Sequence, residues 1–183
     1  LLDLVYGKDG ETPVEDGELT EHLDSQMYEL AYVNIPLYNT STFVFASDDQ
    51  KAEMLQLAQQ AATAANLMDY ENVEDQVSAL HAAAQSALPD IYAVLDATPS
   101  DDASSVQTEL LTESDLTSTF TQDGAADAVR GLVYGEAAAV QYNGYSVILM
   151  MRIDPLQVST LDALRSQILS DMKGEELDDA LAA

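Results

Sequence analysis

The residues that could carry acid–base, nucleophilic or metal chemistry are few in this chain and lie far apart. Its 183 residues include two histidines, His22 and His81, and no cysteine. His22 lies among carboxylates in a helical segment, without a cysteine or second histidine beside it, which indicates an exposed helix residue. His81 follows Leu80 next to an apolar helix face, and no histidine or carboxylate four residues away completes a metal pair. We therefore expect no metal site and no cofactor.

Two aromatic residues, Phe43 and Phe45, occur in the polar loop segment 39–50, NTSTFVFASDDQ. The sequence leaves two roles open for them. The rings either cap the hydrophobic core or border a surface that binds client polypeptides, since exposed aromatic side chains are frequent anchors of interfaces.

The charge balance restricts the partners of this protein. The chain has 33 acidic and 6 basic side chains, a formal net charge of −27. We exclude nucleic acid as a partner, because no basic patch is present to neutralise phosphates. Anionic membrane surfaces are disfavoured for the same reason, whereas cationic clients or basic envelope polymers would be attracted over long range. A simpler interpretation is that dispersed carboxylates keep the protein soluble.

The length of the chain and its 47% hydrophobic content are typical of one ordinary domain with a helical extension. No apolar stretch reaches the length of a membrane span. The chain starts without Met and without a basic-then-apolar leader, so a signal or anchor removed from it remains compatible with the sequence.

The clearest local signal is a β-hairpin centred on Asn143 and Gly144. Both residues tolerate the positive φ of a type I′ turn, and apolar runs flank them on either side. After the turn, both the odd-numbered and the even-numbered positions of segment 145–152 are largely apolar. This pattern predicts a strand that is covered on its two faces, by helices.

The rest of the chain alternates between helical and strand-like segments. Apolar spacing predicts helices over 18–29, from Lys51 with Asp48 or Asp49 as its cap, over 72–88 with Pro89 at its end, and from 161 to Gly174. Segment 30–37 is rich in β-formers, 107–112 is a weaker strand, and 114–120 is a short helix or turn. The acidic segment 175–183 is expected to fray.

The order of these elements resembles the parvulin-type peptidyl-prolyl isomerases, and most of all their extracytoplasmic PrsA- and SurA-like foldases. The residues that carry the resemblance are Leu132-Val133-Tyr134-Gly135-Glu136 followed by Gly144-Tyr145 and the apolar strand after them. The resemblance implies an α+β fold, with a small antiparallel or mixed sheet covered by helices. It also implies a division into a linker segment 1–30, a parvulin-like domain 31–155 and a C-terminal helix 156–183, in which the entering and leaving helices pack as a partial chaperone module.

The same resemblance argues against ordinary isomerase activity. The family uses two histidines with a cysteine or aspartate. The corresponding positions are Tyr32 on the first strand and Ser146 after the hairpin turn, and Asn143 replaces a serine or threonine. With Tyr32 and Ser146 facing each other, this hydroxyl-for-imidazole exchange would preserve some hydrogen bonding but not the family's pocket. Met and Phe of the family's proline pocket fall near Thr121 and Ala125, where Phe120 is a partial substitute.

The resemblance therefore implies a foldase or chaperone that binds unfolded or proline-containing polypeptides outside the cytoplasm, with weak or lost isomerase activity. The expected client-binding residues are Phe43, Phe45, Phe120, Thr121, Ala125 and Tyr145. Two alternatives remain: an active isomerase with a site rearranged around Tyr32, Asn34, Ser146 and Phe120, or a non-catalytic acidic interaction domain. A homodimer through the terminal helices and a removed N-terminal lipid anchor are further expectations.

Overall fold

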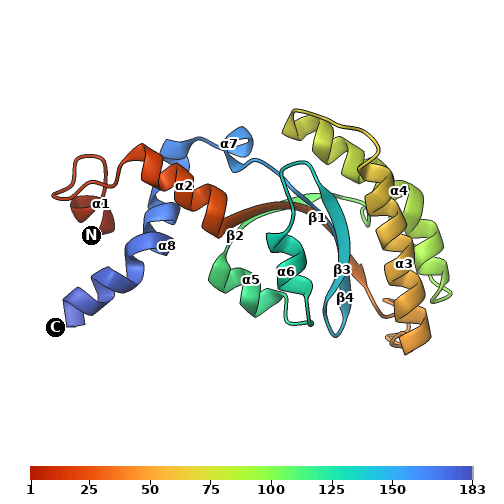
Figure 1. Cartoon of the computed structure of the whole chain (residues 1–183). Helices are drawn as coiled ribbons and strands as arrows, with labels where there is room; N and C mark the ends of the chain where they lie inside the picture. Colours follow the sequence, from red (N-terminus) through yellow and green to blue (C-terminus); the bar gives the residue numbers. More distant parts are fainter. Residues whose placement is uncertain (183) are drawn as a thin grey trace.

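The computed structural model describes residues 1–182 and shows an α+β protein, as expected. Within that range, eight helices surround a four-stranded antiparallel sheet (Figure 1). Helices α3 and α4 cover one face of the sheet, and the short helices α5 and α6 lie on the other. Helices α1, α2 and α8 form a separate helical lobe at one end of the molecule.

The helices are α1 (Leu2–Val5), α2 (Asp16–Gln26), α3 (Asp48–Ala65), α4 (Val73–Ala93), α5 (Glu113–Thr119), α6 (Ala125–Arg130), α7 (Pro155–Val158) and α8 (Leu161–Ala182). The strands are β1 (Met27–Pro36), β2 (Gln107–Thr112), β3 (Ala137–Asn143) and β4 (Ser146–Arg152).

The strands lie in the order β2-β1-β4-β3. Strand β1 pairs with β4 so that Val33 lies opposite Leu149 and Asn34 opposite Ile148. The expected hairpin forms the β4–β3 pair, and the weak strand predicted over 107–112 pairs with the other side of β1. The first and last strands along the chain, β1 and β4, are therefore neighbours in the middle of the sheet.

Strand alternation divides the core between the two faces of the sheet. Ala31, Val33 and Ile35 point to α3 and α4 and belong to the largest buried cluster, which we call the closed face. Leu30 and Tyr32 point to the side of α5 and α6, which we call the open face because Asn34 on it is exposed. Strand β4 is buried at every position, which confirms the prediction that it is covered on both sides.

The helical lobe is held by the packing of α2 against α8. Leu19 and Leu23 of α2 lie in one buried cluster with Ile168 and Leu169 of α8. His22 Nε2 lies 2.6 Å from Asp171 Oδ2, so His22 is a half-buried partner between the helices rather than the exposed residue expected from the sequence. Helices α2 and α8, which enter and leave the sheet domain, thus pack together as expected.

Arg152, at the end of β4, connects this lobe to the sheet. Its guanidinium donates to the backbone carbonyls of Leu132, Asp24 and Met27, at 2.9, 2.8 and 3.4 Å. It also lies over the rings of Tyr28 and Tyr134, 5.0 and 5.2 Å from their centroids. Helix α2 has no basic residue in its last turn. Arg152 therefore supplies the positive charge that the C-terminal end of a helix favours.

Two boundaries of the helices on the closed face differ from the sequence-based expectation. Helix α3 begins at Asp48, because Ser47 is its cap and accepts from the N–H of Gln50. Helix α4 continues through Pro89 to Ala93. The Gln85 carbonyl that Pro89 leaves without an N–H donor is on the exposed side, and burial of Ile91 favours the extra turn.

The helix ends near the helical lobe also differ from expectation. The helix predicted over 18–29 ends at Gln26, since Met27 and Tyr28 pair with β2 and are buried. Helix α8 runs through Gly174 to Ala182 instead of breaking or fraying there, and Lys173 pairs with Glu176 at 2.7 Å across that point. The last residue of the predicted frayed segment lies outside the described residues.

The predicted type I′ hairpin turn is wrong. Positive φ values in residues 1–182 occur at Phe43, Asp96, Gly124 and Gly135, and not at Asn143 or Gly144. Asn143 pairs with Ser146, leaving Gly144 and Tyr145 as the turn, and a bulge between Gln141 and Asn143 accommodates the strand twist. Asn143 Oδ1 accepts from the Tyr145 N–H at 2.8 Å, which stabilises the turn locally.

Candidate functional site

The loop between β1 and α3 is built around one buried polar residue, Asn39. Its Oδ1 accepts from the N–H groups of Ser41 and Thr42, at 3.0 and 3.1 Å. Its Nδ2 donates to the Leu95 carbonyl at 3.0 Å, and its N–H donates to the carbonyl of Val44 at 2.9 Å. The base of the loop is therefore fixed to the end of α4, although its tip extends beyond the sheet.

This loop exposes the two phenylalanines. Phe43 is 73% exposed and Phe45 57% exposed, so the interpretation that they cap the core is wrong. Phe43 has a φ of +57°, a left-handed conformation that costs a side-chain-bearing residue on the order of 1–2 kcal/mol. The chain thus holds a large apolar ring in water, in an unfavourable backbone conformation, on a loop fixed by hydrogen bonds. That combination favours an interaction site.

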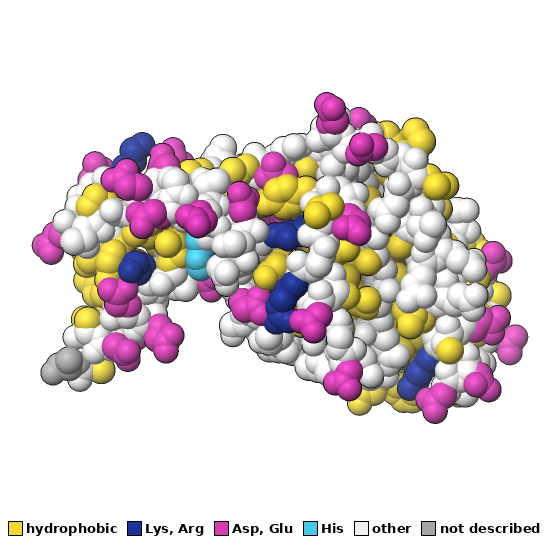
Figure 2. Space-filling view, viewed as in Figure 1, with side chains coloured by type: hydrophobic (Ala, Val, Ile, Leu, Met, Phe, Trp, Pro, Cys, Tyr) yellow, Lys and Arg dark blue, Asp and Glu magenta, His cyan; other side chains and the backbone are white. Residues whose placement is uncertain are grey.

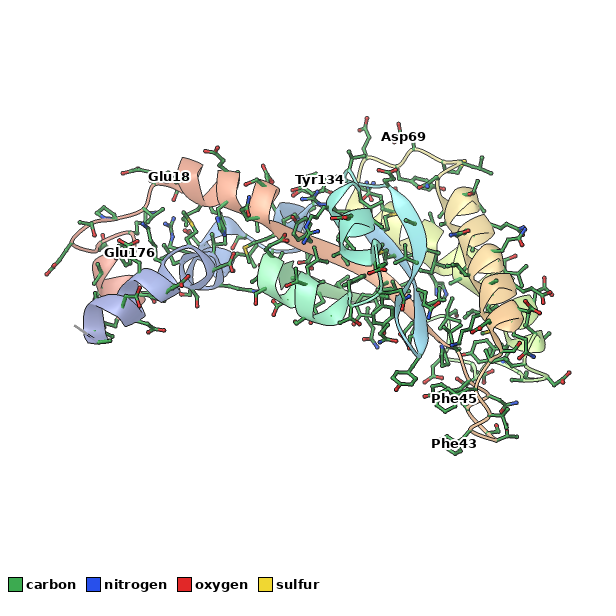
Figure 3. The ribbon with its side chains drawn as sticks, turned by 60° about the horizontal axis from the view of Figure 1, so that its bottom comes forward. Glu18, Phe43, Phe45, Asp69, Tyr134 and Glu176 are labelled. Atoms are coloured by element: carbon green, nitrogen blue, oxygen red, sulfur yellow. The ribbon has the colours of Figure 1, made fainter. Side chains whose placement is uncertain are left out.

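Four aromatic rings form a connected group at this end, which we call the aromatic tip: Tyr38, Phe43, Phe45 and Tyr145. The Tyr38 ring lies 6.5 Å from that of Phe43 and 5.6 Å from that of Phe45, and Phe45 lies 5.8 Å from Tyr145. Figure 3 places Phe43 and Phe45 at the opposite end of the molecule from Glu18 and Glu176 of the helical lobe.

A small cavity of about 80 Å³ opens on the open face of the sheet. Its walls come from all four strands and from the end of α5: Leu30, Tyr32, Glu109, Leu111, Thr119, Phe120, Tyr142 and Ile148. The Phe120 and Tyr142 rings pack at 5.4 Å, and the Tyr142 hydroxyl donates to Asn34 Oδ1 at 2.5 Å. The β3–β4 hairpin therefore contributes to both features, with Tyr142 in the cavity wall and Tyr145 in the aromatic tip.

The polar side chains that line the cavity are the hydroxyls of Tyr32, Tyr142 and Thr119 and the carboxylate of Glu109. Burial, followed by the charge of Glu109 and the neighbouring Tyr142, raises the pKa of Tyr32. The Tyr32 hydroxyl donates to Gln107 Oε1 at 3.3 Å. A tyrosine with a raised pKa stays protonated near neutral pH, so Tyr32 can donate a hydrogen bond there but is poorly suited to proton transfer.

Of the three positions that the resemblance to parvulins singles out, Asn143 and Ser146 are paired at the hairpin turn, whereas Tyr32 lies apart from them. Tyr32 lines the cavity, but Ser146 is buried beside the hairpin turn and pairs with Pro36 and Asn143. Tyr32 lies opposite Met150. The expectation that Tyr32 and Ser146 face each other is therefore wrong, because the register separates them along the sheet.

The expected client-binding residues fall into three groups. Phe43, Phe45 and Tyr145 meet in the aromatic tip, and Phe120 lines the cavity. Thr121 is exposed but does not line the cavity. Ala125, the first residue of α6, is buried in the open-face core and does not line the cavity either.

Sequence reasoning missed Glu109 and Tyr142 of the cavity, Tyr38 of the aromatic tip, and Asn39 at the base of the loop. Asn39 has a recognisable signal, because an Asn before Ser and Thr residues favours a side-chain turn. Glu109 and Tyr142 have none, since each meets the cavity only through pairing of strands that are distant in sequence.

No group of histidines and carboxylates suited to a metal ion occurs among residues 1–182. None of the helices within that range combines the length and apolar character needed to cross a membrane. Acidic side chains are spread over the helical lobe and the sheet domain on the face shown in Figure 2, with few basic ones among them.

Comparison with known proteins gives no relative: no family model, curated protein or solved structure matches this chain.

Proposed function

We propose that this protein binds segments of unfolded polypeptide and shields them from aggregation, as a foldase-like chaperone outside the cytoplasm with weak or no prolyl isomerase activity. The observation that carries the proposal is the aromatic tip, in which Phe43 and Phe45 are held in water on a loop fixed through Asn39. The location and the kinship with parvulins rest on the resemblance in sequence alone.

The tip suits transient capture of apolar segments. Burying one exposed aromatic side chain contributes about 1.5–3 kcal/mol, and association costs several kcal/mol of lost freedom. Two or three rings therefore give weak to moderate affinity, which suits a protein that has to release its client. Because Asn39 already fixes the loop, little ordering entropy is lost on binding.

The cavity favours binding of a small apolar side chain over catalysis. Prolyl isomerisation has a barrier of about 18–20 kcal/mol, which an enzyme lowers by holding a twisted amide in a partly desolvated site. Here the cavity wall contains tyrosine hydroxyls and the Glu109 carboxylate, and both histidines lie elsewhere: His22 in the helical lobe and His81 on α4.

Suppression of aggregation tests the proposal. A chemically denatured client is diluted with or without this protein, and light scattering is followed. The double variant Phe43→Ser/Phe45→Ser is expected to lose at least about fivefold in potency, because two binding rings are removed. Leu67→Ser is the matched control, since Leu67 is 78% exposed outside the tip. Equal potency of wild type and the double variant contradicts the proposal.

Turnover of a proline-containing tetrapeptide separates binding from catalysis. We expect no acceleration above the uncatalysed rate at micromolar protein. Rapid turnover that falls on substitution of Tyr32 with Phe would favour the rearranged isomerase instead.

A further inference from the structure

The two outer edges of the sheet, on β3 and β2, differ in whether other elements bond to their backbone. Along β3, the Asn66 side chain accepts from the N–H of Ala137 and donates to its carbonyl, both at 2.8 Å. The carbonyl of Tyr142, at the other end of β3, accepts from the Gln122 N–H at 3.1 Å. Helix α3 therefore caps this edge near Ala137, and the turn before α6 caps it near Tyr142. No comparable contact within residues 1–182 reaches the outer side of β2 between Gln107 and Leu111.

Sheet register identifies the backbone groups that are free on β2. The Glu29 carbonyl accepts from the Ile153 N–H just beyond β4, so odd-numbered residues of β1 bond towards β4 and even-numbered ones towards β2. Leu30 pairs with Glu109, so odd-numbered residues of β2 bond inward. Thr108 and Leu110 consequently direct their N–H and carbonyl groups outward.

The same alternation places Glu109 at the boundary between this edge and the cavity. Glu109 is exposed and its side chain lies on the open face, where it lines the cavity beside Tyr32. Gln107 and Thr108 are exposed as well, so an arriving chain meets no covering element along this half of the strand.

We propose that the outer edge of β2 accepts an extended segment of the client as a fifth strand, with a lysine or arginine of that segment beside Glu109. The inference rests on the proposed client binding and names the type of segment that is bound. Backbone pairing with Thr108 and Leu110 gives sequence-tolerant affinity, as in other strand-addition complexes. The cross-strand charge pair with Glu109 selects basic segments.

Charge argues for a basic client and against a second copy of this chain. An antiparallel pair of β2 edges would bring two Glu109 side chains near each other, in two molecules that each carry a formal charge of −27. Like charges close together on adjacent strands are destabilising. A basic segment gains from both the local carboxylate and the field of the whole protein.

The test uses a fluorescent peptide of alternating lysine and valine, with fluorescence anisotropy as the readout. Thr108→Pro removes an outward N–H without touching the β1 ladder, so the fold is expected to survive. The affinity of the Thr108→Pro variant for the lysine–valine peptide should fall about tenfold or more. Thr108→Val, which keeps the N–H, should bind like wild type. Glu109→Gln should weaken the lysine peptide and leave an alternating serine–valine peptide unaffected.

Hydrogen exchange of the wild-type protein provides a readout that does not depend on folding of the variants. Bound peptide should slow exchange of the Thr108 and Leu110 amides about tenfold or more. Unchanged exchange at both amides, or a stable dimer that buries them without peptide, overturns the proposal. If Phe43→Ser/Phe45→Ser abolishes aggregation suppression while Thr108→Pro leaves peptide binding unchanged, the tip binds client and the strand addition is wrong. If neither substitution changes either readout, both proposals fail.

Discussion

The closed and open faces of the sheet use the same strands for different purposes. On the closed face, Val33, Ile35 and Leu149 are fully buried between the sheet and the long helices α3 and α4. On the open face, α5 and α6 cover Met150, but Leu30 and Tyr32 line the cavity and Asn34 is exposed. Stability is therefore expected to depend mostly on the closed face, and recognition on the open face and the aromatic tip.

The largest effect is expected from Leu149, at the centre of the closed face. Leu149→Ala removes buried methyl groups and leaves a cavity between the sheet and the helices, which should cost about 3 kcal/mol or more of unfolding free energy. Chemical denaturation measures the loss. Tyr142→Phe on the open face is the comparison, since it removes only one hydroxyl bond to Asn34 and should cost about 1 kcal/mol or less. Equal losses would refute the division between the faces.

An intermediate effect is expected from Glu29, a buried carboxyl on the closed side of β1. Burial, and then the charge of Glu109, raises its pKa from 4.5 to about 7. The folded state therefore binds a proton that the unfolded state has released. Stability is highest below about pH 4.5 with respect to this group, and falls as pH rises towards 7.

Replacing Glu29 with Gln removes this titration. The variant should be more stable than wild type at about pH 8, by about 1–3 kcal/mol, and the difference should shrink in acid. Denaturation at a series of pH values measures it. A difference that is constant across the series would show that Glu29 has the same pKa in both states.

The smallest stability effect is expected at the aromatic tip, with the opposite sign. Phe43→Asn should raise the free energy of unfolding by about 0.5–1 kcal/mol, because asparagine tolerates the left-handed conformation. The same change should weaken client capture, as measured by aggregation suppression. If the variant gains stability and keeps full potency, Phe43 contributes nothing to recognition.

Much of this fold follows from local signals. The hairpin and the strand at 107–112 were predictable, because apolar alternation and flanking turn residues are encoded within each segment. The continuation of α4 through Pro89 was not, since it depends on the tertiary burial of Ile91.

The site was less accessible from sequence than the fold. Single residues such as Phe43 and Phe120 could be proposed as binding residues because they are aromatic. Their partners Tyr38 and Tyr142 could not, because strand register and loop geometry bring them together only in the folded chain. The burial that raises the pKa of Glu29 likewise results from packing in the folded chain, and the residues next to Glu29 in the sequence do not indicate it.

The hydrogen bonds by which Arg152 connects the helical lobe to the sheet predict which contacts of the lobe survive in acid. The Arg165 guanidinium that links α8 to Asp16 of α2 holds the pKa of the Asp16 carboxyl below its usual value, and this ion pair is lost when acid protonates Asp16. The acceptors around Arg152 are peptide carbonyls, which have no proton to gain in that range. Acidification should therefore loosen α8 from α2 first, while α2 stays bound to the end of β4.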